Sequence, residues 1–187
     1  NQENKLKKIL KRILKSDVDI VLTSGAVSAG KFDFVPKTIK KFGIKKIFKN
    51  VAIRPGKPIL FAKFKKKKKF FFGLPGNPIS SAACFRFFVY PFLRKGLGMK
   101  EEKKFKSKLS NKFYKKKNFT RFLKGKLTST NNGNLQIEIL QGQESFRLKP
   151  FVKSNVWGVF KAGQSVFKKG QLIECHSLIT SNKNIFY

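Results

Sequence analysis

Apolar residues recur at helical spacing within the first fifteen positions of the chain. Five of them share one side of a helical projection, and lysines occupy the other side: Leu6, Ile9, Leu10, Ile13 and Leu14. This pattern predicts an amphipathic helix that ends near Ser16. We interpret its lysines as the solvated face of a packing helix rather than as a membrane-binding surface.

A short apolar run with a small-residue loop behind it comes next. Residues 18–22 predict a buried strand, and residues 23–30 follow directly with the sequence Thr-Ser-Gly-Ala-Val-Ser-Ala-Gly. Residues 34–42 then predict a helix, with Pro36 in its first turn and Gly43 as its stop. A strand, a small-residue loop and a helix in this order are typical of an open α/β sheet.

Two more strands are predicted over residues 59–64 and 70–74, after an extended segment at residues 44–53. We expect the five lysines at residues 65–69 to form a solvated hairpin tip between them. Two proline-containing loops flank this pair, Arg-Pro-Gly-Lys-Pro at residues 54–58 and Pro-Gly-Asn-Pro at residues 75–78.

The pattern changes in the second half of the chain. An apolar helix is predicted over residues 79–97, disturbed at Pro91, and a charged segment follows at residues 100–117, where we place a domain boundary. Beyond it we expect short strands and a hairpin at Asn-Asn-Gly-Asn, with the strands over residues 120–128, 135–140, 155–160 and 171–176.

The predicted fold class is therefore α/β, a partial, open, mostly parallel sheet flanked by helices, followed by a small all-β, barrel-like domain. We assign residues 1–103 to the first domain and residues 104–187 to the second. The chain begins without Met inside a predicted helix, which we interpret as a piece of a longer protein.

Composition excludes several classes of protein. The 187 residues are 41% apolar, which argues against a disordered chain, and no run of about 18 apolar residues predicts a membrane span. Two cysteines and one histidine exclude a disulfide framework, a Cys-x-x-Cys metal site and a histidine-rich site. The net charge of +34 allows nonspecific binding of nucleic acid, but the lysines are spread over every segment.

The small-residue loops carry the candidate chemistry. Small residues let a backbone approach a ligand closely, and successive N–H groups can bind an anion. Ser24 and Ser28 add hydroxyl donors, and Asp33 follows closely enough to hold Mg²⁺ or a ligand hydroxyl. Arg54 and Lys57 on their stiff loop would add two cations, so that the loops together would surround an anionic ligand.

Three motifs in order are more specific than any one of them. The sequences TSGAVSAG at residues 23–30, RPGKP at 54–58 and GLPGNPIS at 73–80 resemble the TSGGVSxG, (K/R)PGKP and GLPGNPxS motifs of the molybdopterin molybdenumtransferase family, which includes the C-terminal region of gephyrin. The resemblance covers residues 17–99 well. It continues more loosely through Phe119-Thr-Arg121 and residues 141–145.

This resemblance implies an enzyme of molybdenum cofactor biosynthesis. Such an enzyme uses Mg²⁺, takes molybdate and adenylylated molybdopterin as substrates, inserts the metal into the dithiolene and releases AMP. It also implies a cytoplasmic location and a homodimer in the full-length protein. By position it assigns catalytic roles to Asp33 and Lys57, and Asp33 is also the expected metal ligand. The expected ligand-binding residues are Ser24, Gly25, Ser28, Gly30, Arg54, Pro75, Gly76, Asn77, Pro78 and Ser145.

Some positions depart from the family pattern. Ala26 replaces the second glycine of its pair, at a cost of about 1 kcal/mol if the position needs a positive φ. Lys31, Asn50 and Glu144 also differ from the usual residues, and a TGDE-type motif is absent. We therefore expect little activity from this chain alone.

Three other readings stay open at this point. A molybdopterin adenylyltransferase has a similar α/β domain, although its glycine loop continues as GGTG. The other two are a basic nucleic-acid-binding module and a scaffold use of the same fold.

Overall fold

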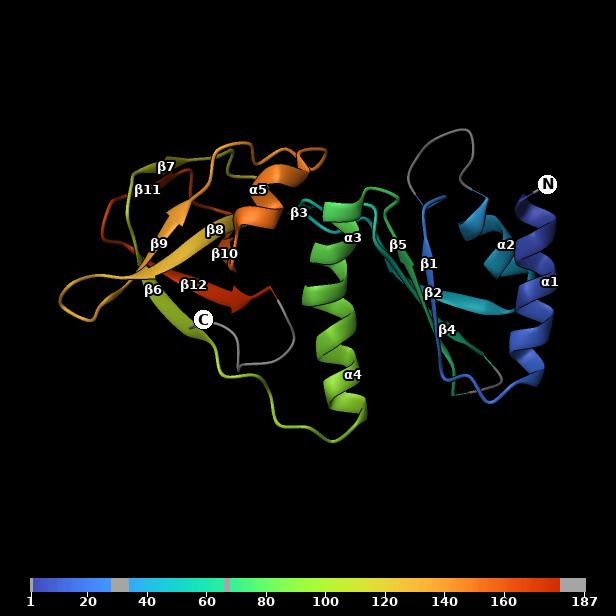
Figure 1. Ribbon diagram of the computed structural model, residues 1–187. Helices are drawn as coiled ribbons and strands as arrows, with labels where there is room; N and C mark the ends of the chain where they lie inside the picture. Colours follow the sequence, from blue (N-terminus) through green and yellow to red (C-terminus); the bar gives the residue numbers. More distant parts are fainter. Residues whose placement is uncertain (1, 28–33, 66–67, 179–187) are drawn as a thin grey trace. The chain divides into compact units, whose positions relative to one another are not determined.

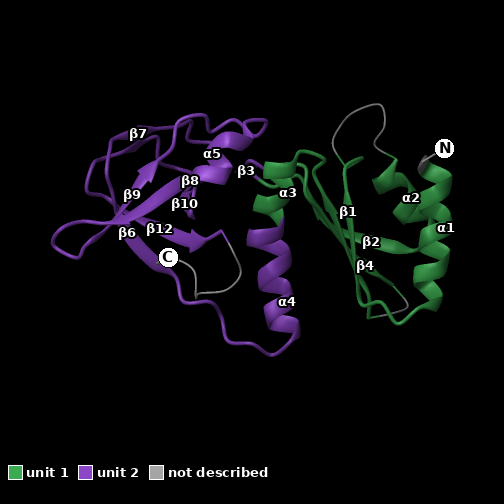
Figure 2. Cartoon of the chain, viewed as in Figure 1, with its two compact units in different colours: residues 1–51, 56–84 green, residues 52–55, 85–187 purple. Residues whose placement is uncertain are grey.

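The computed structural model describes residues 2–27, 34–65 and 68–178 of the chain (Figure 1). Internal contacts divide the chain into two compact units (Figure 2). Unit 1 comprises residues 1–51 and 56–84, and unit 2 comprises residues 52–55 and 85–187. From residue 85, within a helical run, all following residues belong to unit 2. The domain boundary after residue 103 stays a prediction.

Unit 1 is built on a four-stranded sheet in the order β1-β5-β4-β2. The strands are β1 (Ile20–Ser24), β2 (Ile44–Lys49), β4 (Leu60–Phe64) and β5 (Phe70–Leu74). Only β1 and β5 pair in parallel, whereas β4 is antiparallel to both β2 and β5. The prediction of a mostly parallel sheet is wrong, because a short hairpin joins β4 to β5 and a parallel pair needs a long crossover.

Helices α1 (Gln2–Lys15) and α2 (Val35–Lys41) cover one face of this sheet (Figure 1). Leu6 and Leu10 on the apolar side of α1 are buried as predicted and pack in one core with residues of α2 and β5, whereas Ile9 on the same predicted side is exposed. Gly43 ends α2 at φ 67°, a conformation that glycine adopts without strain.

The prediction of a solvated lysine tip fails at Lys69. Lys65 and Lys68 are exposed, and residues 66–67 lie outside the described part. The Lys69 side chain is instead buried, and its Nζ atom donates to the carbonyl oxygens of Ser16 and Val18 at 2.5 Å each. Lys69 therefore binds backbone carbonyls that follow the C-terminal end of α1, where a cation is favourable.

The helical run after β5 has three parts: α3 (Pro78–Cys84), a π-helical turn (Phe85–Val89) and α4 (Tyr90–Gly96). We expected the disturbance at Pro91, but the irregular turn precedes it and Pro91 lies in the first turn of α4. A proline has no N–H and its ring clashes with the carbonyl four residues back, which accounts for a widened turn before it.

Unit 2 is a closed β-barrel, as predicted, with strand order β10-β12-β6-β9-β8 and a β10–β8 pairing that closes it. Its strands are β6 (Phe105–Leu109), β8 (Thr120–Ser129), β9 (Leu135–Ile139), β10 (Val156–Phe160) and β12 (Leu172–Ser177). The strand β3 (Ile53–Arg54) adds to β8 in parallel. A minor pair, β7 (Phe113–Tyr114) and β11 (Val166–Phe167), and the short helix α5 (Leu148–Lys153) complete the unit.

The barrel has its own apolar core. Leu123, Ile137, Val156 and Phe160 are all inaccessible to solvent, or nearly so. Two strands that we had not anticipated, β6 and β7, lie in the charged segment at residues 100–117. In β6, buried and solvent-facing positions alternate, so its lysines point outward. Over the described residues, no helix is both long and apolar enough to cross a membrane.

Candidate functional site

In unit 1, two loops that are distant in the sequence begin at the same edge of the sheet. Ser24 at the end of β1 pairs with Leu74 at the end of β5. The backbone N–H of Gly25 donates to the carbonyl oxygen of Leu74 at 2.9 Å. The start of the 23–30 loop and the 75–78 loop therefore lie side by side.

These loops approach each other through glycine backbones. A Cβ atom added to Gly76 would lie 3.4 Å from the Cα atom of Gly25, and one added to Gly25 would lie 3.9 Å from Cα of Gly76. Gly25 also has φ 84°, a value that residues with side chains rarely adopt. A Cβ atom at either position would fill the space between the two backbones, whereas with glycine at both positions backbone atoms form the surface at this contact.

Hydrogen bonds hold the second loop in place. The carbonyl oxygen of Pro75 accepts from Ser24 Oγ at 3.4 Å and from Ser81 Oγ. Asn77 Oδ1 accepts from the backbone N–H of Ser80 at 3.1 Å and so caps α3, which begins at Pro78. The 75–78 loop is thereby a rigid turn.

Three residues that the sequence analysis selected, Ser28, Gly30 and Asp33, lie outside the described residues. Within the described ranges, no three His, Cys, Asp or Glu side chains lie close enough to hold a metal ion. Asp17 and Asp19 precede β1, at the end of the strand opposite to Gly25. The described carboxylates of unit 1 therefore do not form a Mg²⁺ site at the glycine contact.

The RPGKP loop is divided between the units. Arg54 is exposed and belongs to β3 of unit 2, where it is in register with Arg121 of β8. Lys57 is exposed and belongs to unit 1, and its carbonyl oxygen accepts from the backbone N–H of Val51 at 2.9 Å. The structure thus pairs Arg54 with a residue that the sequence analysis had not selected.

Arg121 is in an unusual environment for an arginine. Burial lowers its pKa, the charge of Arg54 lowers it further, and the carboxylate of Glu144 opposes both effects. Its Nε atom is buried and makes no hydrogen bond with any residue that the structure describes. Two arginines in register whose charges act on each other, one of them with a buried Nε donor that no described residue accepts from, are suited to binding an anion.

Two buried lysines of unit 2 differ from this pair, because their ammonium groups bind backbone carbonyls. Lys115 Nζ donates to the carbonyl oxygen of Phe119 at 2.9 Å. Lys124 is 1% exposed, and its Nζ donates to three carbonyl oxygens, those of Gly142 at 2.8 Å, Glu144 at 3.1 Å and Arg147 at 3.3 Å. We therefore assign a structural function to these lysines and retain Arg54 and Arg121 as the cations available to a ligand.

Ser145 lies in the loop that Lys124 holds, and it is half-buried. Its neighbour Glu144 forms an ion pair with Arg147 at 3.3 Å and acts electrostatically on Arg121. Glu144 thus brings a negative charge toward the arginine pair, as its departure from the family pattern suggested. The fragment Phe119-Thr-Arg121 was the sequence signal that could have identified Arg121.

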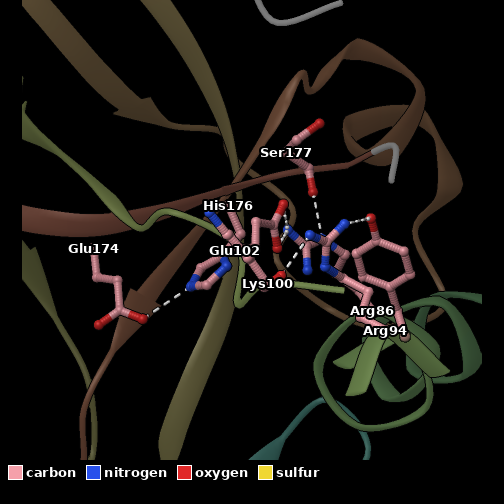
Figure 3. A network of polar contacts seen from close by, with 8 residues as sticks. Arg86, Arg94, Lys100, Glu102, Glu174, His176 and Ser177 are labelled. Atoms are coloured by element: carbon pink, nitrogen blue, oxygen red, sulfur yellow. Dashed lines mark hydrogen bonds and ion pairs between the residues drawn. The ribbon is translucent and has the colours of Figure 1, made fainter. Parts of the chain in front are cut away.

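A separate cavity of about 610 Å³ in unit 2 is lined by residues 86–95 and by strands β8, β10 and β12. Figure 3 shows its polar network. Buried Arg86 donates to both carboxylate oxygens of Glu102, at 2.7 and 2.6 Å, and to the carbonyl oxygen of Ser177 at 2.8 Å. His176 Nε2 lies 2.8 Å from Glu174 Oε1. Arg86 pairs with Glu102, and His176 pairs with Glu174. We interpret the network as structural, because Arg86 also connects the helical residues to the barrel strand β12.

Comparisons with known proteins agree with the motifs. Residues 1–95 match a family model described as "Probable molybdopterin binding domain", and residues 106–178 match one described as "MoeA C-terminal region (domain IV)". The chain is 33% identical over 172 residues to a molybdopterin molybdenumtransferase of Synechococcus elongatus, covering 91% of this chain and 41% of the relative. It is 32% identical to that of Haemophilus influenzae, covering 85% and 39%.

Solved structures show the same fold. A molybdopterin biosynthesis moeA protein from Pyrococcus horikoshii aligns with a TM-score of 0.70 at 24% identity, over 94% of this chain and 41% of that chain. A molybdenum cofactor biosynthesis protein from Pyrococcus furiosus aligns with a TM-score of 0.62 at 16% identity, over 94% and 53%. The chain spans about two fifths of the length of the curated relatives described above.

Proposed function

Because the chain belongs to the molybdopterin molybdenumtransferase family, we propose that it forms two anion-binding parts of an enzyme that inserts molybdenum from molybdate into adenylylated molybdopterin and releases AMP. The activity is proposed for a longer protein, since the chain spans about two fifths of its relatives. The observation that carries the proposal is the contact of two family motifs through Gly25 and Gly76.

The glycine contact of unit 1 is suited to a phosphate. Backbone atoms without intervening side chains can approach a phosphate closely, and hydroxyls beside them can donate further hydrogen bonds. In this proposal Gly25 and Gly76 lie against the phosphate or nucleotide part of the substrate, and Ser24 Oγ exchanges its 3.4 Å hydrogen bond to Pro75 for one to the substrate. Ser28 and Gly30 would continue the same loop, and Lys57 would neutralise charge as the phosphoanhydride is cleaved.

The arginine pair of unit 2 is suited to molybdate. A tetrahedral dianion can accept hydrogen bonds from two guanidinium groups at once, and its charge would oppose the burial and the repulsion by Arg54 that together lower the pKa of Arg121. Ser145 would contribute its hydroxyl from the adjoining loop. Arg54, Arg121 and Ser145 therefore form the proposed oxyanion site of unit 2.

Asp33 is the proposed Mg²⁺ ligand, on the strength of its position three residues after the glycine motif. No mechanistic step is assigned to the metal, because Asp33 lies outside the described residues. The homodimer and the cytoplasmic location also stay predictions that rest on the family.

The test is molybdate-dependent release of AMP from adenylylated molybdopterin by the full-length protein. We expect release with the native protein and a loss on the order of 100-fold with Asp33→Asn, at unchanged circular dichroism. Asp17→Asn is the matched control and should retain activity. Absence of molybdate-dependent AMP release from the native protein would refute the proposed function. Native turnover by Asp33→Asn would refute only the catalytic role of Asp33.

The comparisons support none of the alternative functions. The relatives quoted above are transferases or proteins of molybdopterin biosynthesis, and no nucleic-acid-binding domain model is among the two matches.

A further inference from the structure

The loop at residues 140–147 is attached to strand β8 in a way that ordinary sheet pairing does not provide. Strand β9 ends at Ile139, and its backbone ladder with β8 ends at the Gly125–Ile139 pair. The next position on β8 is Lys124, which pairs on its other side with Trp157 of β10. One more backbone hydrogen bond follows, in which the N–H of Leu140 donates to the carbonyl oxygen of Lys124 at 3.1 Å.

The side chain of Gln143 adds to this pairing at the backbone of Lys124. Its Oε1 atom accepts from the backbone N–H of Lys124 at 2.9 Å, and its Nε2 atom donates to the carbonyl oxygen of Lys124 at 2.8 Å. A carboxamide presents one acceptor and two donors in the plane of a peptide group, so it can imitate a residue of an antiparallel strand. The second Nε2 donor is used by the carbonyl oxygen of Leu140 at 2.6 Å.

The ammonium group of Lys124 binds the same loop from inside. Its three N–H donors match three carbonyl acceptors, those of Gly142, Glu144 and Arg147. Burial lowers the pKa of Lys124, while the nearby Glu144 carboxylate opposes this effect. Lys124 therefore holds the loop in two ways: its backbone binds the Gln143 side chain, and its ammonium group binds three carbonyl oxygens of the loop backbone.

Lys124 lies three positions after Arg121 on the same strand, and the loop that it holds carries Glu144 and Ser145. We infer that Lys124, acting with Gln143, is a positioning residue that fixes Ser145 and Glu144 beside Arg121 and so sets the affinity of the oxyanion site. This inference rests on the proposed function for its effect on binding. Its structural part, the anchoring of the loop, can be measured independently.

The experiment uses the 187-residue chain, with tungstate as the probe and with amide hydrogen exchange as a second readout. Lys124→Met removes the three donors and keeps an unbranched apolar side chain. We expect it to weaken tungstate binding about tenfold or more, as loss of a supporting residue commonly does, and to accelerate exchange at residues 142–147 while strands β6, β10 and β12 stay protected. Lys126→Met, at an exposed position of the same strand, is the control for loss of one positive charge and should change neither readout.

The outcomes separate the inference from the proposed function. If the native chain does not bind tungstate, the oxyanion site is wrong, and exchange in Lys124→Met still decides whether Lys124 fixes the loop. If the native chain binds and Lys124→Met binds equally well, or leaves loop exchange unchanged, the inference is overturned. Should Lys124→Met fail to fold, Gln143→Asn carries the test, because it shortens the carboxamide and leaves the three carbonyls of Lys124 in place. Native affinity and native loop exchange in a folded Gln143→Asn would equally overturn the inference.

Discussion

At the scale of single residues, Ala26 shows how a departure from a motif is tolerated. It adopts φ 54°, where the family pattern has glycine and where a Cβ atom is strained. The adjoining Val27 is fully buried, and a Cβ atom added to Gly73 would lie 2.6 Å from its Cγ1 atom. The packing of Val27 against β5 therefore holds the loop in place beside Ala26, which keeps its strained conformation.

Ala26→Gly should therefore stabilise the chain by about 0.5–1 kcal/mol, since relief of strain exceeds the loss of one half-buried methyl group. Urea unfolding followed by circular dichroism measures this. Ala82→Gly is the matched control, because the same change inside α3 should destabilise by about 0.5–1 kcal/mol. A lower midpoint for Ala26→Gly would contradict the strain.

Lys69 shows why a run of lysines cannot be read as uniformly solvated. Its ammonium group binds two carbonyl oxygens, so Lys69→Met should lower the free energy of unfolding by about 2–3 kcal/mol. Lys68→Met at the exposed neighbour should change it by less than about 0.5 kcal/mol. Chemical denaturation of both variants tests the difference, and equal effects would show that Lys69 has no special role.

At the scale of elements, strand β12 places Glu174 and His176 on one face, two residues apart. Burial lowers the pKa of His176, the hydrogen bond with Glu174 opposes this, and the positive charge of Arg86 lowers it further, with Glu102 acting in the opposite sense. The net shift is downward. The unfolded chain therefore binds a proton more readily, and the stability contributed by neutral His176 is lost as the pH falls below its unfolded pKa of about 6.5.

We expect the urea midpoint of the chain to fall between pH 7.5 and pH 5.5, and this decrease to be smaller in His176→Gln. His176 is the single histidine of the sequence, so other side chains titrate little in this range. If the urea midpoint decreased equally in the native chain and in His176→Gln, a group other than His176 would be responsible for the decrease.

At the scale of the whole molecule, the local motifs predicted most helices and strands, and they placed the two glycine loops at one sheet edge because both follow strands. The hairpin predicted at residues 65–69 is confirmed by the antiparallel pairing of β4 with β5, but the sheet was still predicted to be mostly parallel, although that hairpin already made one of its pairs antiparallel. The barrel strand β3 has two residues and no local signal, so the pairing of Arg54 with Arg121 was not visible. Nothing in the pattern marks Lys69 or Lys124 as buried, since lysines are usually solvated.

The charge of the whole chain predicts weak association with nucleic acid. With +34 spread over the sequence, binding to RNA should be independent of RNA sequence and should fall steeply as salt rises. Filter binding from 50 to 200 mM salt tests this, with a loss of about 10³-fold or more expected if six or more phosphates are contacted. Saturable, sequence-specific binding at physiological salt would instead favour a nucleic-acid-binding function.

The most direct test of the oxyanion site is the position of tungstate in a crystal of the chain, located by anomalous diffraction. Tungstate has the charge and shape of molybdate and scatters strongly enough to be identified without ambiguity. Our account predicts a tungsten atom within about 4 Å of the guanidinium nitrogens of Arg54 and Arg121, consistent with a charge-assisted hydrogen-bonded complex. Tungsten found only beside solvated lysines, with the arginine pair unoccupied at saturating tungstate, would contradict it.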